Sequence, residues 1–235
     1  MERLDRILSQ AGAATRSEAK TLIKAGRVTV DGVTASRPEQ KVGEDSVVAL
    51  DGRALGRGRI YLLLYKPAGV VSSTRDPRDR TVLELLPEVW RGKDLFPVGR
   101  LDKDTEGLLL LTDDGDLAHR LTSPRYAVEK TYYARVDGVV DETDAAAFAQ
   151  GMTLADGTLC RPAVLEPLEP GACRVKLREG KYHQVRRMLA ARGKPVTYLR
   201  REAEGGLDLR GLEPGQVREL TEGEVAALRR EAEKS

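Results

Sequence analysis

Three carboxylates and a guanidinium are crowded into one short stretch of this sequence. They are Arg100, Asp102, Asp104 and Glu106, all within residues 99–107. The stretch lies between the apolar residues 95–98 and the four leucines of residues 108–111, and such flanks predict buried strands. A loop between buried strands can hold a carboxylate in a fixed position. There the carboxylate can bind a metal ion, react with a substrate or shape a turn.

The spacing of these acids partly fits a calcium-binding loop of the helix–loop–helix type. Such a loop needs a preceding helix, whereas residues 96–99 are strand-like. The four leucines would also fill the second half of the loop, although their side chains favour burial. The sequence therefore argues against calcium. A divalent ion held by Asp102 and Asp104 stays open, and so does a turn in which Arg100 pairs with one of the acids.

A second stretch with chemical potential is basic. Residues 174–201 contain ten Lys or Arg and one acid, Glu179. A glycine-led loop runs into a predicted helix with Val185 and Leu189 facing inward and Gly193 at its end. The free N–H groups of the helix start, together with the basic and aromatic side chains, favour nucleic-acid binding over an ordinary basic surface helix. The candidate contacts are Lys181, Tyr182, Arg186 and Arg187.

The bulk properties limit the class of protein. The chain has 235 residues, of which 40% are apolar and 32% charged, enough for a packed core and for a small plus a medium domain. No apolar run is long enough to span a bilayer, and residues 1–4 do not begin a signal peptide. Two cysteines and two histidines form no disulfide or metal pattern. We therefore expect a protein of the cytoplasm that is not bound to a membrane.

Residues 1–50 are predicted to form a separate, α-rich module. Helical spacing near residues 4–11, a capping box of Thr15 and Glu18, and a hairpin turn at residues 31–32 indicate two helices followed by strands. The candidate phosphate contacts on its helices are Arg3, Arg16, Lys20 and Lys24. An ordinary solvated face is the alternative. Residues 51–59, rich in Gly and Arg, read as a linker, so that residues 60–235 form the second domain.

Strands and helices are mixed in the second domain. Strands are predicted at residues 60–65, 129–136, 163–165 and 173–177, and helices after Asp116, over residues 141–150 and after Thr221. Residues 72–80 form a polar loop with three arginines, and Thr81 with Glu84 makes a capping box that opens a short helix.

Two sets of motifs resemble known families. The pieces R-L-D-R-I-L-S-Q-A-G, T-R-S-E-A-K-T-L-I-K-A-G and R-V-T-V-D-G, within residues 1–48, resemble the RNA-binding module named after ribosomal protein S-four. G-R-L-D-x-D-T-x-G-L-L-L-L-T resembles the signature of the pseudouridine synthases. Residues 66–69, 130–132 and 180–188 resemble further motifs of that family in the same order. The resemblance implies an α+β fold with a mostly antiparallel mixed β-sheet flanked by helices.

Within the family, Y-H-Q-V-R-R-M, T-S-P-R and R-P-A-V-L-E are most similar to the RsuA branch, which acts on uridine 516 of 16S rRNA. Large-subunit relatives tend to carry Asn-Arg where this chain has Tyr182 and His183. Residues 200–206 match less closely. The resemblance implies a monomer that acts on 16S rRNA or a small-subunit assembly intermediate. A 23S rRNA substrate, or a non-catalytic ribosome-assembly role in RNA binding, is the alternative.

The resemblance also assigns roles to residues. Asp102 would be the nucleophile, Arg186 its charge partner, and Tyr132 the ring that stacks on the target base and assists removal of a proton. Arg100 would fill the gap that the flipped uridine leaves. The other two acids and residues 66–69 would brace the loop. The isomerisation needs no redox change or group donor, so neither a cofactor nor a metal is expected.

Overall fold

The computed structural model describes residues 2–43, 46–55 and 59–233. The chain divides into two compact units, Met1–Arg59 and Ile60–Ser235. No helix in these described ranges is long and apolar enough to cross a bilayer.

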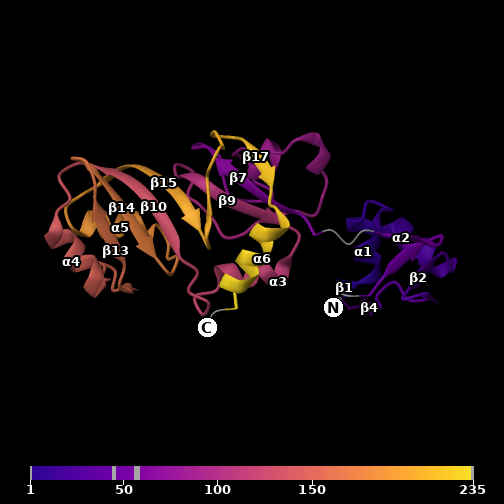
Figure 1. Ribbon diagram of the computed structural model, residues 1–235. Coiled ribbons are helices and arrows are strands. Elements are labelled where there is room, and N and C mark those ends of the chain that lie inside the picture. Colours follow the sequence, from indigo (N-terminus) through magenta and orange to yellow (C-terminus); the bar gives the residue numbers. More distant parts are fainter. Residues whose placement is uncertain (1, 44–45, 56–58, 234–235) are drawn as a thin grey trace. The chain divides into compact units, whose positions relative to one another are not determined.

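The N-terminal unit packs two short helices against two small sheets (Figure 1). Its elements are β1 (Glu2–Arg3), α1 (Leu4–Gln10), α2 (Arg16–Lys24), β2 (Val28–Val30), β3 (Val33–Thr34), β4 (Lys41–Val42), β5 (Val48–Leu50) and β6 (Arg53–Ala54). The predicted capping box starts α2, because Glu18 accepts from the Thr15 backbone N–H and the Thr15 hydroxyl accepts from the Glu18 N–H. Leu4, Leu8 and Ile23 are fully buried in its core.

The predicted linker begins later in the chain than its composition indicates. Asp51 and Gly52 form a turn, and β6 follows as the edge strand of the sheet β3–β2–β5–β6. Arg53 pairs with Leu50 and Ala54 with Ala49. A two-residue exposed strand buries almost nothing, so its sequence carries no apolar alternation. Residues 56–58 of the predicted linker lie outside the described residues.

The C-terminal unit is built on one large mixed sheet. The strands of this sheet are β7 (Tyr61–Lys66), β8 (Phe96–Pro97), β9 (Glu106–Thr112), β10 (Lys130–Val136), β13 (Val164–Pro167), β14 (Ala172–Leu177), β15 (Val196–Glu204), β16 (Leu207–Asp208) and β17 (Val217–Glu219). Strands β11 (Met152–Thr153) and β12 (Leu159–Cys160) form a separate two-stranded sheet. The helices of the unit are α3 (Gly115–Thr122), α4 (Glu142–Gln150), α5 (Gln184–Ala191) and α6 (Glu222–Glu231), with 3-10 turns η1 (Val82–Leu85) and η2 (Glu88–Trp90).

The sheet has the order β13–β14–β10–β15–β9–β7–β17, with β16 added beside β15 and β8 beside β9. All pairs are antiparallel except β15 with β9, which run parallel. Helices α4 and α5 pack near β13, β14 and β10, whereas α3 and α6 pack together below β9 (Figure 1). The expected α+β fold with a mostly antiparallel mixed sheet is confirmed.

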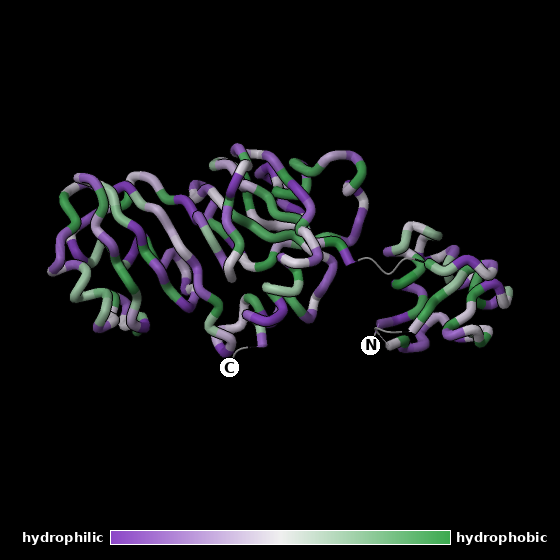
Figure 2. Tube along the Cα trace, in the orientation of Figure 1, coloured by the Kyte–Doolittle hydropathy of each residue, from purple (hydrophilic) through white to green (hydrophobic). Residues whose placement is uncertain are grey.

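Strand β9 is buried on both faces. Leu108 and Leu110 pack with α3 and α6, while Leu109 and Leu111 pack with η1 on the opposite side. The continuous apolar run of β7 and β9 in the middle of the sheet is visible in Figure 2. The loop of acids therefore leads into the most buried strand of the unit. It follows strand β8, not a helix, which removes the context that a calcium loop needs.

Two local predictions differ from the structure. Helix α3 is capped by Asp114, whose side chain accepts from the Leu117 N–H at 3.1 Å, and not by Asp116. Strand β15 was not predicted, because its charged residues 200–202 resemble an exposed segment. In the structure β15 is central and Arg201 is buried beside Glu204.

Glycine at position 107 is required by the approach of β15. Gly107 has φ +112°, and a Cβ added there would lie 2.2 Å from the backbone oxygen of Arg201. That distance is inside any non-bonded contact, so a side chain would push β9 and β15 apart.

We predict that Gly107→Ala lowers the free energy of unfolding by about 3 kcal/mol more than Gly157→Ala does. Gly157 also has positive φ (+82°) but no atom within 4 Å of an added Cβ, so it isolates the cost of the backbone angle, about 1–2 kcal/mol. Urea titration of the three proteins measures this difference. Equal destabilisation by the two substitutions would show that the close approach is not rigid.

Candidate active site

Asp102 lies in a loop whose backbone is clamped from below. The ammonium of Lys66, at the end of β7, is fully buried. It donates to the carbonyl oxygens of Pro67 at 3.0 Å, Lys103 at 3.3 Å and Thr105 at 2.8 Å. The Ser72 hydroxyl donates to the Leu101 oxygen at 2.9 Å and accepts from the Leu101 N–H at 3.0 Å. The main chain on both sides of Asp102 is therefore fixed.

The nearby carboxylates stabilise the positive charge of Lys66. Burial lowers the pKa of Lys66 to about 8, and the nearby carboxylates of Asp104, Asp102 and Glu106 oppose that shift. With a pKa near 8, most Lys66 side chains carry a positive charge at neutral pH. The acids of the loop thus stabilise the buried cation that holds their own backbone. Pairing a buried charge in this way is what makes its burial tolerable.

The carboxylate of Asp102 is contacted on both oxygens. One oxygen, Oδ1, lies 3.3 Å from Nε2 of His183, and Oδ2 accepts from the Thr105 hydroxyl at 3.5 Å. The Asp102 side chain is 29% exposed, so a substrate can reach it. His183 has φ +47° and ψ +33°, the left-handed conformation, at the residue before α5. A non-glycine residue in this conformation is uncommon and points to a constraint at the site.

Arg186 was predicted to pair with Asp102, but the structure pairs it with a different acid. Its Nη2 lies 2.9 Å from Oδ2 of Asp104. The left-handed turn at His183 places the imidazole against Asp102. Arg186, which follows inside α5, reaches the loop two residues farther along. Asp104 therefore binds the arginine and leaves Asp102 facing a histidine.

Tyr132 enters the same pocket from β10 and packs against the cores on both sides of it. Its strand neighbour in β15 is Arg201, which is almost fully buried. The Arg201 Nε donates to the Leu108 oxygen at 2.8 Å, and its Nη2 lies 3.1 Å from Glu204. Burial raises the pKa of the Tyr132 phenol, and the nearby Arg201 guanidinium opposes that rise. The phenol is thus kept protonated, which suits stacking and hydrogen bonding better than proton abstraction.

A pocket of about 80 Å³ brings four of the predicted residues together with one that was not predicted. They are Arg100, Asp102, Tyr132, Lys181 and His183. Its apolar wall comes from Leu177, Val185 and Leu199. Three distant segments of the chain, in the loop before β9, in β10 and at the start of α5, thus converge on one carboxylate.

The other predicted RNA contacts of residues 174–201 differ in their exposure and in their partners. Tyr182 is 76% exposed and stacks on His183 with ring centroids 3.9 Å apart. Arg187 pairs with Asp156 at 2.5 Å, and the Lys181 ammonium donates to the Leu159 oxygen. The basic residues of β14, Arg174 and Lys176, pair with Glu166 and Glu202, and Arg178 just after the strand pairs with Glu129. Much of the local positive charge is therefore neutralised within the fold.

In the N-terminal unit, a separate pocket of about 360 Å³ gathers basic side chains. It is lined by Arg3, Asp5, Arg6, Arg16 and Lys20. The Arg3 guanidinium donates two hydrogen bonds to Asp5, at 3.0 and 2.8 Å, and these bonds lower the pKa of that carboxyl. Lys24 is exposed on α2 outside this pocket. A surplus of cations around a pocket of this size suits a phosphate group.

Sequence reasoning missed two residues of the site. His183 belongs to the basic motif, but nothing in its type or spacing shows that it contacts Asp102 and that Arg186 does not. Arg201 lies in an arginine pair that looked exposed, and only the position of β15 in the sheet shows its burial. The prediction that residues 66–69 brace the loop is confirmed by the hydrogen bonds of Lys66 and by the bond from the Gly69 N–H to the Lys103 oxygen at 2.7 Å.

Known proteins are similar to this chain over nearly its whole length. A family model for RNA pseudouridylate synthase matches residues 60–191, and one for the S4 domain matches residues 2–48. "Ribosomal small subunit pseudouridine synthase A" of Escherichia coli (strain K12) is 44% identical over 232 residues, covering 96% of this chain and 99% of that protein. "Uncharacterized RNA pseudouridine synthase YtzG" of Bacillus subtilis is 43% identical over 234 residues, covering 96% and 98%.

A solved structure agrees with these sequences. A crystal structure of a pseudouridylate synthase superposes with a TM-score of 0.69 at 36% identity, covering 97% of this chain and 100% of that one. The chain therefore belongs to the RNA pseudouridylate synthases and carries an S4 domain ahead of its catalytic unit.

Proposed function

We propose that this enzyme converts one uridine of 16S rRNA, uridine 516 in the usual count, to pseudouridine, with Asp102 as the nucleophile. The observation that carries the proposal is the fixed Asp102 carboxylate in one pocket with Tyr132 and His183. The choice of RNA rests on relatives named as small-subunit enzymes at 44% identity over nearly the full chain.

The reaction moves a glycosidic bond from nitrogen to carbon. Attack of the Asp102 carboxylate on C1′ of the ribose breaks the C1′–N1 bond and leaves the uracil as an anion. The base turns, its C5 attacks C1′, and the C1′–oxygen bond to Asp102 breaks. The proton on C5 then leaves, and N1 gains a proton. Atoms and electrons balance within the nucleotide and the carboxylate, so the step asks only for a positioned nucleophile.

Other residues of the pocket position the base. The Tyr132 ring, with its raised pKa, offers a neutral surface on which uracil can stack. Arg100 is exposed at the pocket and can occupy the space that the flipped nucleotide leaves in the RNA. His183 orients the carboxylate through the 3.3 Å contact, and the exposed Tyr182 ring extends the stacking surface outward. Lys181 and Arg187 lie at the rim, where an RNA phosphate competes with Glu179 and Asp156 for their charge.

The S4 domain would supply RNA affinity that is independent of the chemistry. Its basic pocket and the exposed Lys24 are suited to phosphates of a folded 16S segment, either as free RNA or in an assembly intermediate of the small subunit. We propose that the enzyme acts as a monomer in the cytoplasm, where that RNA is made and assembled.

Tritium release from uridine labelled at C5 tests the reaction and its substrate together. We predict release from 16S transcripts or precursor particles but not from 23S rRNA. Asp102→Asn is expected to lose at least about 10³-fold in rate, because the amide is a poor nucleophile. Release from 23S rRNA alone would contradict the substrate. No release from either RNA by the wild-type protein would favour a non-catalytic RNA-binding role.

Charge removal in the S4 domain should weaken RNA binding in a salt-dependent way. For Lys20→Ala combined with Lys24→Ala, we predict that the slope of log K against log salt becomes shallower by about 1 for each phosphate that the variant no longer neutralises. Filter binding at several salt concentrations measures it. Arg53→Ala, an exposed charge in β6 on the sheet β3–β2–β5–β6 of the domain, is the control. An unchanged slope in the double variant would remove α2 from the RNA-binding surface.

His183 is predicted to act by positioning Asp102. His183→Ala should lower the single-turnover rate by about 10²-fold, the cost of a small misplacement of the nucleophile. His183→Asn should recover most of that loss, since asparagine tolerates the left-handed conformation and can donate to the carboxylate. Both variants lose the stacking of His183 on Tyr182. Their RNA affinity is therefore measured separately, so that a change in binding is not mistaken for a change in rate. Equal rates for the alanine and asparagine variants would exclude the contact as the cause.

A further inference from the structure

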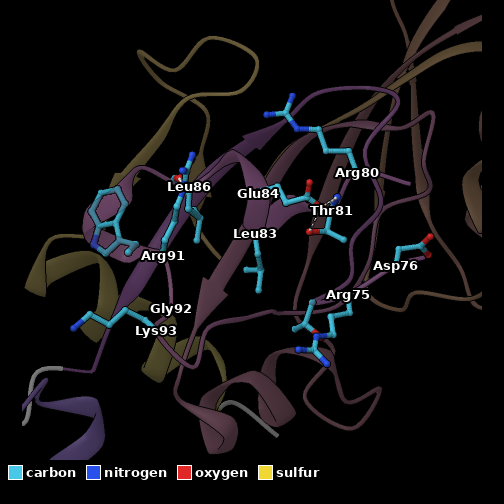
Figure 3. Close-up of a pocket in the computed structure, with 12 residues that line it drawn as sticks. Arg75, Asp76, Arg80, Thr81, Leu83, Glu84, Leu86, Arg91, Gly92 and Lys93 are labelled. Atoms are coloured by element: carbon cyan, nitrogen blue, oxygen red, sulfur yellow. Dashed lines mark hydrogen bonds between the residues drawn. The ribbon is translucent and has the colours of Figure 1, made fainter. Parts of the chain in front are cut away.

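A second pocket lies in the segment between β7 and β8, outside the pocket that holds Asp102 (Figure 3). Its volume is about 590 Å³, against about 80 Å³ for the catalytic pocket. Residues 74–76, 80, 81, 83, 84, 86 and 90–93 supply its lining. The sequence predicts a polar loop with three arginines in this segment, and the catalytic mechanism uses none of them.

Basic side chains outnumber acids around this pocket. The cations are Arg75, Arg80, Arg91 and Lys93, and the acids are Asp76 and Glu84. Figure 3 shows Arg75, Arg80 and Lys93 on different sides of Leu83 and Glu84. Within the described ranges of the chain, these three cations have no direct ion-pair partner, and Arg80 interacts with Glu84 only at longer range. A phosphate entering here would find charges that the fold has left available.

Both acids are occupied by local turns. Asp76 accepts from the backbone N–H groups of Arg78 and Asp79, each at 2.9 Å. Glu84 accepts from the backbone N–H of Thr81 at 2.9 Å and from its hydroxyl at 3.1 Å. These hydrogen bonds lower the pKa of both carboxyls and direct their oxygens into the backbone. The acids therefore offer little competition to an incoming anion.

The pocket also contains an aromatic ring. Trp90 is the only tryptophan of the chain, and its ring is half-buried. The indole N–H donates to Glu219 at 3.3 Å, which holds the ring in place. Leu83 and Leu86 add apolar surface. A flat ring beside unpaired cations is the combination that binds nucleotides, through stacking on the base and charge on the phosphate.

Two contacts tie this segment to the catalytic loop. Ser72 exchanges hydrogen bonds with Leu101, and Lys103 pairs with Asp79 at 2.6 Å. The chain that enters the pocket is thus bonded to the residues on both sides of Asp102. An RNA strand with its uridine at Asp102 can continue over this surface.

We propose that this pocket binds a segment of the RNA substrate outside the target uridine, with separate phosphates on Arg75, Arg80 and Lys93 and one base near Trp90. The inference rests on the proposed function only in taking RNA as the substrate. The pocket then fixes the direction in which the strand leaves the catalytic pocket, which a small uridine site cannot do alone.

Trp90 fluorescence reports on this pocket without any need for turnover. The protein is full-length and carries Asp102→Asn, and the ligand is a labelled 16S hairpin that contains the target uridine. Anisotropy of the label measures total binding, while Trp90 emission measures occupancy of the pocket. We expect the hairpin to quench Trp90 emission in a saturable way. In the double variant Arg80→Ala with Lys93→Ala, the RNA concentration at half-quenching should rise about 10-fold. The slope of log K against log salt should become shallower by about 2. Arg135→Ala, an exposed charge on β10 outside the pocket, should leave both signals unchanged.

The outcomes separate the pocket from the proposed function. A hairpin that binds by anisotropy without changing Trp90 emission overturns the pocket and leaves the RNA substrate intact. Equal quenching in the double variant also overturns it. Quenching by a free mononucleotide, at concentrations where the hairpin has no effect, would show a small-molecule site instead. Circular dichroism confirms that the variants are folded, which is expected because Arg80 is exposed.

Discussion

The buried ammonium of Lys66 is the contact on which the catalytic geometry depends. A charge removed from water is costly unless it is fully paired, and Lys66 meets that requirement with three backbone oxygens and the field of three acids. The same bonds fix the backbone of the loop that carries Asp102. The acids that first suggest a metal site therefore have another use. Asp104 and Glu106 hold the cation and its neighbours, with Asp104 on Arg186 and Glu106 accepting from Tyr198 at 2.8 Å.

The parallel pairing of β9 with β15 unites the two halves of the catalytic unit. It requires Gly107 and buries Arg201 next to Tyr132, and both follow from one close approach of two backbones. Tyr132 packs against the cores on either side of this junction. A pocket at such a junction collects side chains from distant segments on rigid strands, which is what positions a carboxylate for reaction.

Local signals in the sequence were sufficient for much of this architecture. The capping boxes at Thr15 and Thr221 start α2 and α6 as predicted, and the leucines of β9 are buried. Strand β15 could not be predicted because its arginines, Arg200 and Arg201, are neutralised by Glu202 and Glu204 of the same strand, and only the fold shows these pairs. The contact of His183 with Asp102 could not be predicted for a different reason. One left-handed residue before α5 decides whether His183 or Arg186 faces the carboxylate, and no propensity encodes that choice.

We infer that the loop of residues 99–107 holds Asp102 as its one reactive carboxylate and uses Asp104 and Glu106 as supports. Single-turnover rates at saturating RNA for Asp102→Asn, Asp104→Asn and Glu106→Gln test it most directly. We predict a rate loss of at least about 10³-fold for Asp102→Asn. We predict losses within about 10²-fold for the other two variants, since those acids act through position and charge. A rate for Asp102→Asn equal to or above those of the other two variants would contradict it.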